Sequence, residues 1–329
     1  MTDYLPLPGT PVNELDTPCI VVDLDIAEAN ITKLQAAANE MGVDVRPHFK
    51  TTKSPYWARK QLAAGAIGIC CAKVGEAEVM VEAGVPDVMI TNQVIGASKI
   101  TRMVALARAA NVIVAVDDSS NVQQLSEIAS AAGAELGVIV EINVGQDRCG
   151  VDGDGGVELA RQIAASPGLR FDGLMGYEGH IVAERDYETR KTEAEKSMAV
   201  LLGAADQIRI EGIEVKVVSA SGTGTYSITG RVDGVTELQC GSYIFMDGDY
   251  VDVFDDFAPA LSVLATVVSR QREDLAVADL GLKSISIDRG FADVLSPTGA
   301  TIIGHSEEHT KIELSSEAAR RSEERRVGK

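Results

Sequence analysis

The feature that most constrains this chain is an alternation of short, β-branched apolar runs with Ala-rich stretches of helical period. Eight runs read as strands: 43–48, 66–71, 87–91, 112–116, 137–144, 171–177, 215–219 and 237–241. Almost wholly apolar strands separated by helices indicate parallel pairing with both faces buried. Eight such units in about 200 residues favour a closed (β/α)8 barrel of the TIM type over an open doubly wound sheet.

The stretches between these runs read as helices with recognisable ends. They are 56–64, 74–83, 98–109, 121–132, 156–165 and 186–210. Gly65, Gly84, Gly133 and Gly212 follow four of them, and glycine is a common residue just past a helix C-terminus. These stops support the division of the chain into repeated strand–helix units.

Two regions fall outside the alternation. A run at 17–23 precedes the first barrel unit, and runs at 261–271, 275–278, 284–288 and 301–303 follow without intervening helices. We therefore predict a barrel over residues 24–257 and a smaller β-rich domain from residues 1–23 and 258–320. Residues 321–329, RSEERRVGK, are charged and aperiodic and are interpreted as a non-native tail, which would leave the β-rich domain truncated.

Charge and composition exclude several classes of protein. Lys+Arg 30 against Asp+Glu 49 gives a formal net charge of −19, without a basic stripe to neutralise phosphates. A nucleic-acid partner and an anionic membrane surface are therefore not expected. No signal peptide or run of about 18 apolar residues is apparent, and five cysteines with two adjacent make a poor disulfide framework. We expect a cytoplasmic protein.

The most informative motif is RPHFKTTK, residues 46–53, at the C-terminal end of the first barrel strand. Reactive residues of such barrels gather at that end. A lysine enclosed there loses its proton more readily than the free side chain, and Schiff-base chemistry needs the neutral amine. Lys50 is therefore a candidate for covalent attachment of a carbonyl compound.

Three further segments complete a candidate pocket. Arg148 lies between Gly145 and Gly150 after the fifth strand and could donate to an anionic oxygen. The segments 219–225 and 239–243 follow the seventh and eighth strands with small and hydroxyl residues, and barrels commonly hold a phosphate there. An amine, an arginine and a phosphate cradle together describe a pyridoxal phosphate pocket.

These segments carry a family resemblance. RPHFKTTKS, GICCAKVGEAE, NVGQDRCGV, GYEGH, SGTGTY and ELQCGSYIFMDGDY together resemble the D-threonine aldolase / D-serine dehydratase family, and the similarity extends over residues 15–309. The last motif is most similar to the branch that contains 3-hydroxy-D-aspartate aldolase. The resemblance implies an alanine-racemase-like, fold-type III pyridoxal phosphate enzyme: a (β/α)8 barrel with a β domain, usually a homodimer.

The resemblance also implies roles for seven residues. Lys50 would bind the cofactor covalently, Arg148 would donate to its phenolate oxygen, and Tyr177 would lie beside its ring. The phosphate would be held by Thr223, Gly241 and Ser242, with Tyr250 nearby.

This chain departs from the family pattern at three places. Thr52 and Ala72 stand where family members usually carry His and can carry Gln. The family binds a divalent metal (Mg, Mn or Zn) through a His-x-Asp or His-x-Cys pair, which would lie beyond residue 329. His305 and His309 lack such partners and are not taken as ligands, so no metal ligand is assigned. His180 could contact substrate or pack at a strand end.

The resemblance implies a metal-activated lyase acting on D-β-hydroxy amino acids. Retro-aldol cleavage of D-threonine or 3-hydroxy-D-aspartate to glycine and an aldehyde is the favoured activity. D-serine dehydratase activity, a non-catalytic pyridoxal phosphate-binding protein and an inactive truncated form remain alternatives.

Overall fold

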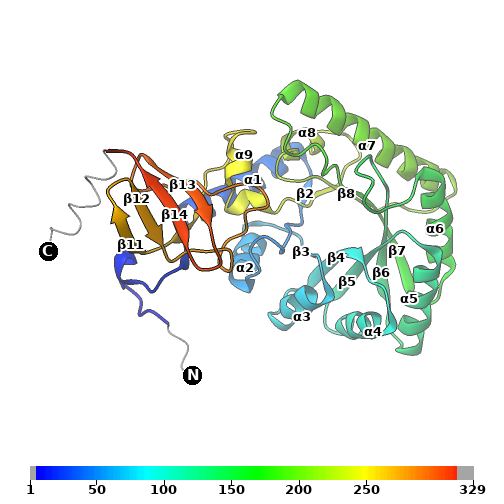
Figure 1. The fold of residues 1–329 in the computed structure, drawn as a ribbon. Helices are drawn as coiled ribbons and strands as arrows, with labels where there is room; N and C mark the ends of the chain where they lie inside the picture. Colours follow the sequence, from blue (N-terminus) through cyan, green and yellow to red (C-terminus); the bar gives the residue numbers. More distant parts are fainter. Residues whose placement is uncertain (1–4, 317–329) are drawn as a thin grey trace. The chain divides into compact units, whose positions relative to one another are not determined.

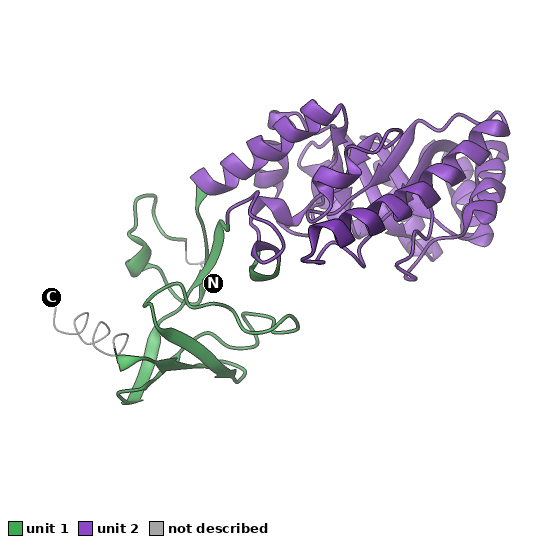
Figure 2. Cartoon of the chain, turned by 90° about the horizontal axis from the view of Figure 1, so that it is seen from above, with its two compact units in different colours: residues 1–24, 247–249, 259–329 green, residues 25–246, 250–258 purple. Residues whose placement is uncertain are grey.

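The computed structural model describes residues 5–316. The described residues form two compact units (Figure 2). The larger one comprises residues 25–246 and 250–258, and the smaller one comprises residues 5–24, 247–249 and 259–316. No helix within the described residues is long and apolar enough to cross a membrane.

The larger unit is built on a curled sheet of eight parallel strands (Figure 1). Their spatial order is β2 (Asp44–Val45), β9 (Glu237–Leu238), β8 (Val217–Ala220), β7 (Leu169–Gly176), β6 (Leu136–Glu141), β5 (Asn111–Val116), β4 (Asp87–Gln93) and β3 (Ile69–Cys71). The two ends of this sheet also meet. The Ile67 amide donates to the Val45 carbonyl at 3.0 Å, and a parallel bridge joins His48 to Cys70. The predicted (β/α)8 class is confirmed.

Helices connect the successive strands. They are α1 (Leu24–Met41), α2 (Pro55–Ala64), α3 (Val74–Glu82), α4 (Ala97–Leu106), α5 (Ser119–Ala131), α6 (Gly153–Ala165), α7 (Tyr187–Ile210) and the short α8 (Tyr226–Thr229). Six of these match the helices expected from sequence to within a few residues at their ends. Helix α1 was not specified, although Ala27, Ile31, Leu34 and Ala38 recur at helical spacing and are buried.

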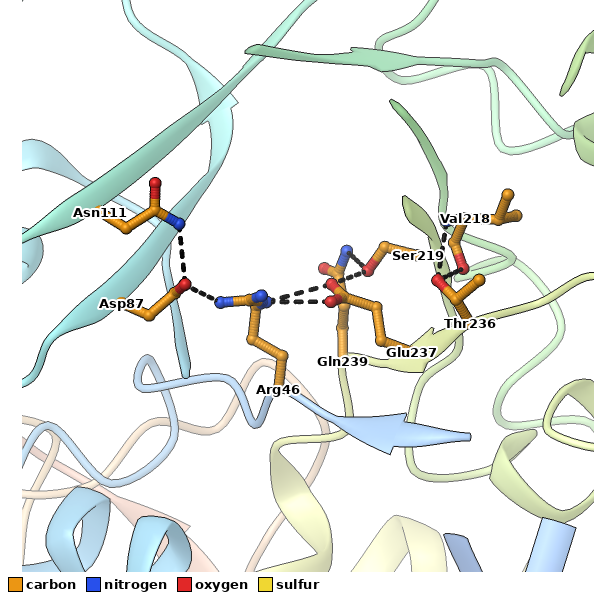
Figure 3. Close-up of polar contacts among 8 residues, drawn as sticks. All are labelled: Arg46, Asp87, Asn111, Val218, Ser219, Thr236, Glu237 and Gln239. Carbon is orange, nitrogen blue, oxygen red and sulfur yellow. Dashed lines mark hydrogen bonds and ion pairs between the residues drawn. The ribbon is translucent and has the colours of Figure 1, made fainter. Parts of the chain in front are cut away.

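The barrel interior has an apolar layer and a polar one. The apolar layer packs Cys70, Met89, Ile113, Ala115, Ile139 and Met175 together from neighbouring strands. In the polar layer, the buried Arg46 donates to both carboxylate oxygens of Glu237 and contacts Asp87 (Figure 3). Gly68 leaves room for this contact, because a Cβ there would lie 2.2 Å from Arg46 Nη1.

The polar layer extends across several strands through uncharged side chains. Asn111 donates to Asp87 at 2.8 Å, Ser219 donates to Glu237 at 2.7 Å, and Gln239 donates to Ser219 at 2.7 Å (Figure 3). Buried charges are stable only when paired and hydrogen-bonded. The network meets that requirement and ties the short strands β2 and β9 to β4, β5 and β8.

The smaller unit is β-rich, as predicted. β1 (Cys19–Val22) pairs antiparallel with β10 (Leu261–Leu264), so the early strand joins this unit. A four-stranded antiparallel sheet has the order β11 (Val267–Arg272), β12 (Leu275–Ala278), β14 (Thr310–Leu314) and β13 (Ala300–His305). The predicted run 261–271 is thus two strands in different sheets.

One strand prediction in this unit is wrong. Residues 284–288 alternate Ser or Asp with Ile but form turns, because the amides of Ser284 and Ile285 both donate to the Gly281 carbonyl. Ile287 is left exposed instead of covering a sheet. The strand missed from sequence is β14, and the suspected tail at 321–329 lies outside the described residues.

Candidate active site

One pocket of the barrel unit is lined by all seven residues singled out from sequence. Each lies beyond the end of a barrel strand, where parallel strands bring their C-termini together. Lys50 follows β2, Arg148 follows β6, Tyr177 follows β7, Thr223 follows β8, Gly241 and Ser242 follow β9, and Tyr250 lies in α9 (Gly248–Val251).

Lys50 extends into this pocket beside Tyr177. Its Nζ lies 5.8 Å from the centroid of the Tyr177 ring. Enclosure by the surrounding protein lowers the pKa of Lys50, and the positive charge of Arg148 lowers it further. Both effects favour the neutral amine, the nucleophilic form of lysine.

His48 supports the turn that carries Lys50. Its Nδ1 accepts a hydrogen bond from the Lys50 amide at 3.3 Å, and its Nε2 lies 3.3 Å from Thr91 Oγ1. Burial lowers the pKa of His48 to about 3, with smaller contributions from Lys50 and Arg148. The imidazole is therefore neutral near pH 7, with Nδ1 as acceptor and its proton on Nε2.

Arg148 also lies near the Tyr177 ring. Its Cζ is 5.5 Å from the Tyr177 centroid, and its Nη2 is 3.9 Å from Glu141 Oε1. The second oxygen of Glu141 accepts from Gln93 Nε2 at 2.6 Å. Burial raises the pKa of Tyr177 to about 12, so the phenol stays neutral. Arg148 remains half-exposed and free to donate to an anion in the pocket.

The two glycine-containing loops offer backbone donors. Among the described residues, the amides of Thr223, Gly224, Gly241 and Ser242 have no hydrogen-bond acceptor. Thr223 Oγ1 accepts from the Tyr243 amide at 3.0 Å and so ties the two loops together. A Cβ at Gly241 would lie 2.8 Å from Thr51 Oγ1, so a larger residue at this position would crowd Thr51. Of these four residues, Thr223, Gly241 and Ser242 line the pocket, and backbone amides without acceptors suit a phosphate group.

The donor set therefore fits pyridoxal phosphate. Lys50 supplies the amine for its aldehyde, the loop amides suit its phosphate, and Arg148 can face its phenolate oxygen.

Comparison with known proteins gives the same assignment. Residues 22–249 match the family model "Alanine racemase, N-terminal domain", and residues 260–329 match "Putative serine dehydratase domain". A D-threonine aldolase of Arthrobacter sp. is 39% identical over 93% of this chain and 82% of its own length. A 3-hydroxy-D-aspartate aldolase of Paracoccus denitrificans (strain Pd 1222) is 38% identical over 94% and 84%.

Other relatives extend the comparison to a solved structure and to a second activity. The crystal structure of a D-threonine aldolase from Filomicrobium marinum superposes with a TM-score of 0.91 at 39% identity, covering 94% of this chain and 84% of that one. A D-threo-3-hydroxyaspartate dehydratase of Delftia sp. (strain HT23) is 32% identical over 84% of this chain and 74% of its length. The chain belongs to the D-threonine aldolase / D-serine dehydratase family. Members of this family with the alanine racemase fold are pyridoxal phosphate enzymes, so the chain is assigned that cofactor.

Of the positions where this chain departs from the family pattern, only one lines the pocket. Ala72 lines it, whereas Thr52 does not, and the buried Thr52 hydroxyl has no hydrogen-bond partner in the described part of the chain. His180 is exposed and does not line the pocket, and His305 bonds to Thr310 Oγ1 at 2.7 Å. Within residues 5–316, no group of three or more His, Cys, Asp or Glu side chains could hold a metal ion.

Among the pocket residues to which sequence reasoning gave no role are a histidine and a glutamate. His48 and Glu141 both line the pocket, although only their neighbours Lys50 and Arg148 were given roles. The signal was present for His48, because it ends the predicted strand 43–48 inside the RPHFKTTK motif, whereas Glu141 lies within the predicted strand 137–144 and ahead of the NVGQDRCGV motif. Their hydrogen-bond partners, Thr91 and Gln93, come from β4 and could not be paired with them from sequence spacing.

Proposed function

We propose that this chain is a pyridoxal phosphate-dependent lyase that cleaves D-β-hydroxy amino acids, D-threonine or 3-hydroxy-D-aspartate, to glycine and an aldehyde. The observation that carries the proposal is the set of groups in one pocket: a lysine with a lowered pKa, an arginine, and loop amides without acceptors. Two aldolase relatives at 38–39% identity support the choice of reaction.

The bound cofactor would withdraw electrons from the substrate α-carbon, so that the Cα–Cβ bond can break while its electron pair stays on Cα. The β-hydroxyl loses its proton and becomes the aldehyde oxygen, and Cα gains a proton to give glycine. Lys50 Nζ is the group positioned to exchange with the substrate amine and to carry a proton at Cα. Arg148, whose Cζ lies 5.5 Å from the Tyr177 ring, would donate to the phenolate oxygen of the cofactor, and Tyr177 would lie beside the cofactor ring.

A divalent metal (Mg, Mn or Zn) is also implied by family membership. Within residues 5–316, no group of three or more His, Cys, Asp or Glu side chains could hold it. Family membership also leads us to propose a cytoplasmic homodimer, and light scattering on the purified chain would measure its oligomeric state.

Dehydration is the second candidate, supported by the Delftia relative. In that reaction Cα loses its proton and the β-hydroxyl leaves, which yields a keto acid and ammonia after hydrolysis. Product analysis after incubation with cofactor, added Mn²⁺ or Mg²⁺, and D-threonine, 3-hydroxy-D-aspartate or D-serine separates the two. We expect glycine and aldehyde in equal amounts, and none from the L-isomers. Equal amounts of ammonia and keto acid would instead establish the dehydratase, and turnover of neither kind would contradict the lyase assignment.

A further inference from the structure

A fully buried carboxylate stands next to the pocket without taking part in the chemistry described so far. Glu178 follows Tyr177 after β7 and has no exposed surface. Its Oε1 accepts from Thr225 Oγ1 at 2.7 Å and from Thr229 Oγ1 at 2.6 Å. Its Oε2 accepts from the Ser221 amide at 3.1 Å. Among the described residues, no Lys or Arg forms an ion pair with it.

All three donors come from the segment that follows β8. Burying a carboxylate without a cation is costly unless several donors converge on it. Here they come from residues 221–229, which comprise the loop that contains Thr223 and the short helix α8. Glu178 therefore fastens that loop to the end of β7, on the neighbouring barrel strand.

The contacts with Glu178 accompany an unusual backbone conformation at the start of this loop. Ser221 has φ of +80°, a conformation that non-glycine residues rarely adopt. The Gly222 amide bonds to Thr225 Oγ1 at 3.2 Å, the same hydroxyl that donates to Glu178. The amides of Ser221 and Gly222 are thus engaged within this cluster, while those of Thr223 and Gly224 have no acceptor within residues 5–316.

We propose that Glu178 is a positioning residue for the cofactor phosphate: it holds residues 221–225 so that the amide of Thr223, which lines the pocket, is available to a phosphate oxygen. This inference rests on the proposed pyridoxal phosphate site. It assigns Glu178 no contact with the cofactor, and its effect passes through the Ser221 amide and the Thr225 and Thr229 hydroxyls.

The test compares the affinity of the apo-protein for pyridoxal phosphate with its affinity for pyridoxal, which lacks the phosphate. For Glu178→Ala we expect the Kd of pyridoxal phosphate to rise at least about tenfold, the scale of a hydrogen bond to a charged group. The Kd of pyridoxal should change by less than about twofold, because its attachment at Lys50 does not use the loop amides. Equal weakening of both ligands, or no weakening of either, would overturn the inference.

If Glu178→Ala does not fold, two variants of Thr229 test the same inference with a smaller perturbation. Thr229→Val removes one donor to Glu178 and should raise the Kd of pyridoxal phosphate by about threefold or more, without changing the Kd of pyridoxal. Thr229→Ser keeps the hydroxyl and should have the wild-type Kd for pyridoxal phosphate. Thr310→Val is the matched control, because it removes a buried threonine hydroxyl in the β-rich unit and should leave both affinities unchanged. If the wild-type chain does not prefer pyridoxal phosphate over pyridoxal, the proposed function fails before this inference is reached.

Discussion

At the scale of single residues, the pocket places two cations against one neutral aromatic ring. Lys50 Nζ and Arg148 Cζ lie 5.8 and 5.5 Å from the Tyr177 centroid. The proximity of Arg148 makes protonation of Lys50 less favourable, so the amine that attacks an aldehyde is available at a lower pH. We therefore expect Arg148 to have two separable effects, one on the bound cofactor and one on Lys50.

The first effect predicts a loss of cofactor affinity. Arg148→Ala removes a charge-assisted hydrogen bond worth about 1.5–3 kcal/mol, so the Kd of pyridoxal phosphate should rise about tenfold or more. The absorbance of the bound cofactor should shift as well. The control is Arg161→Ala, which removes an exposed ion pair with Glu211 on the outer helices and should change neither property. Unaltered affinity, absorbance and turnover in Arg148→Ala would rule out its contact with the cofactor.

The second effect predicts a pH dependence. The rate at which the apo-protein binds pyridoxal should rise with pH as Lys50 loses its proton. Because the folded protein lowers the pKa of Lys50, the midpoint should lie below the value of about 10.4 for free lysine. In Arg148→Ala the midpoint should move up, since one of the two causes of the lowered pKa is gone. Stopped-flow absorbance measures both. A wild-type midpoint at or above that of free lysine would contradict the assignment.

At the scale of elements, the barrel strands could be predicted because parallel strands buried on both faces leave an unmistakable apolar pattern. The β-rich unit was less predictable. The run 284–288 and β14 at Thr310–Leu314 both alternate apolar and polar residues, yet only β14 forms a strand. It lies between β12 and β13, whereas the amides of 284 and 285 are used in a turn. Alternation shows that a strand could form, and the available partner decides whether it does.

Substitution of Gly173 tests how closely β7 and β8 approach each other. Gly173 has φ of +149°, and a Cβ there would lie 2.0 Å from the Val217 carbonyl oxygen. Gly173→Ala should therefore lower the free energy of unfolding by about 2–4 kcal/mol. Gly203→Ala, at an exposed position of α7 with nothing within 4 Å, should raise it by about 0.5–1 kcal/mol. Urea unfolding of both variants gives the two values, and a Gly173→Ala variant as stable as the wild type would refute the close packing.

At the scale of the whole molecule, the meeting of the seven pocket residues follows from topology. Residues as far apart as Lys50 and Ser242 come together because successive parallel strands end at one rim of the barrel. Sequence could therefore anticipate which loops meet. It could not anticipate the supporting contacts, such as Glu178 with Thr229 or His48 with Thr91, because these depend on loop conformations that no periodicity encodes.

The central claim is that this pocket carries pyridoxal phosphate on Lys50, and borohydride reduction of the cofactor-loaded protein tests it most directly. Reduction makes the cofactor–lysine bond permanent, and peptide mapping then identifies the labelled lysine across the whole chain. Lys53 and Lys73 serve as internal controls, because both are near in sequence but neither lines the pocket. We expect one pyridoxyl group per chain, on Lys50, and its absence in Lys50→Ala. A label confined to Lys53 or Lys73 would contradict the account.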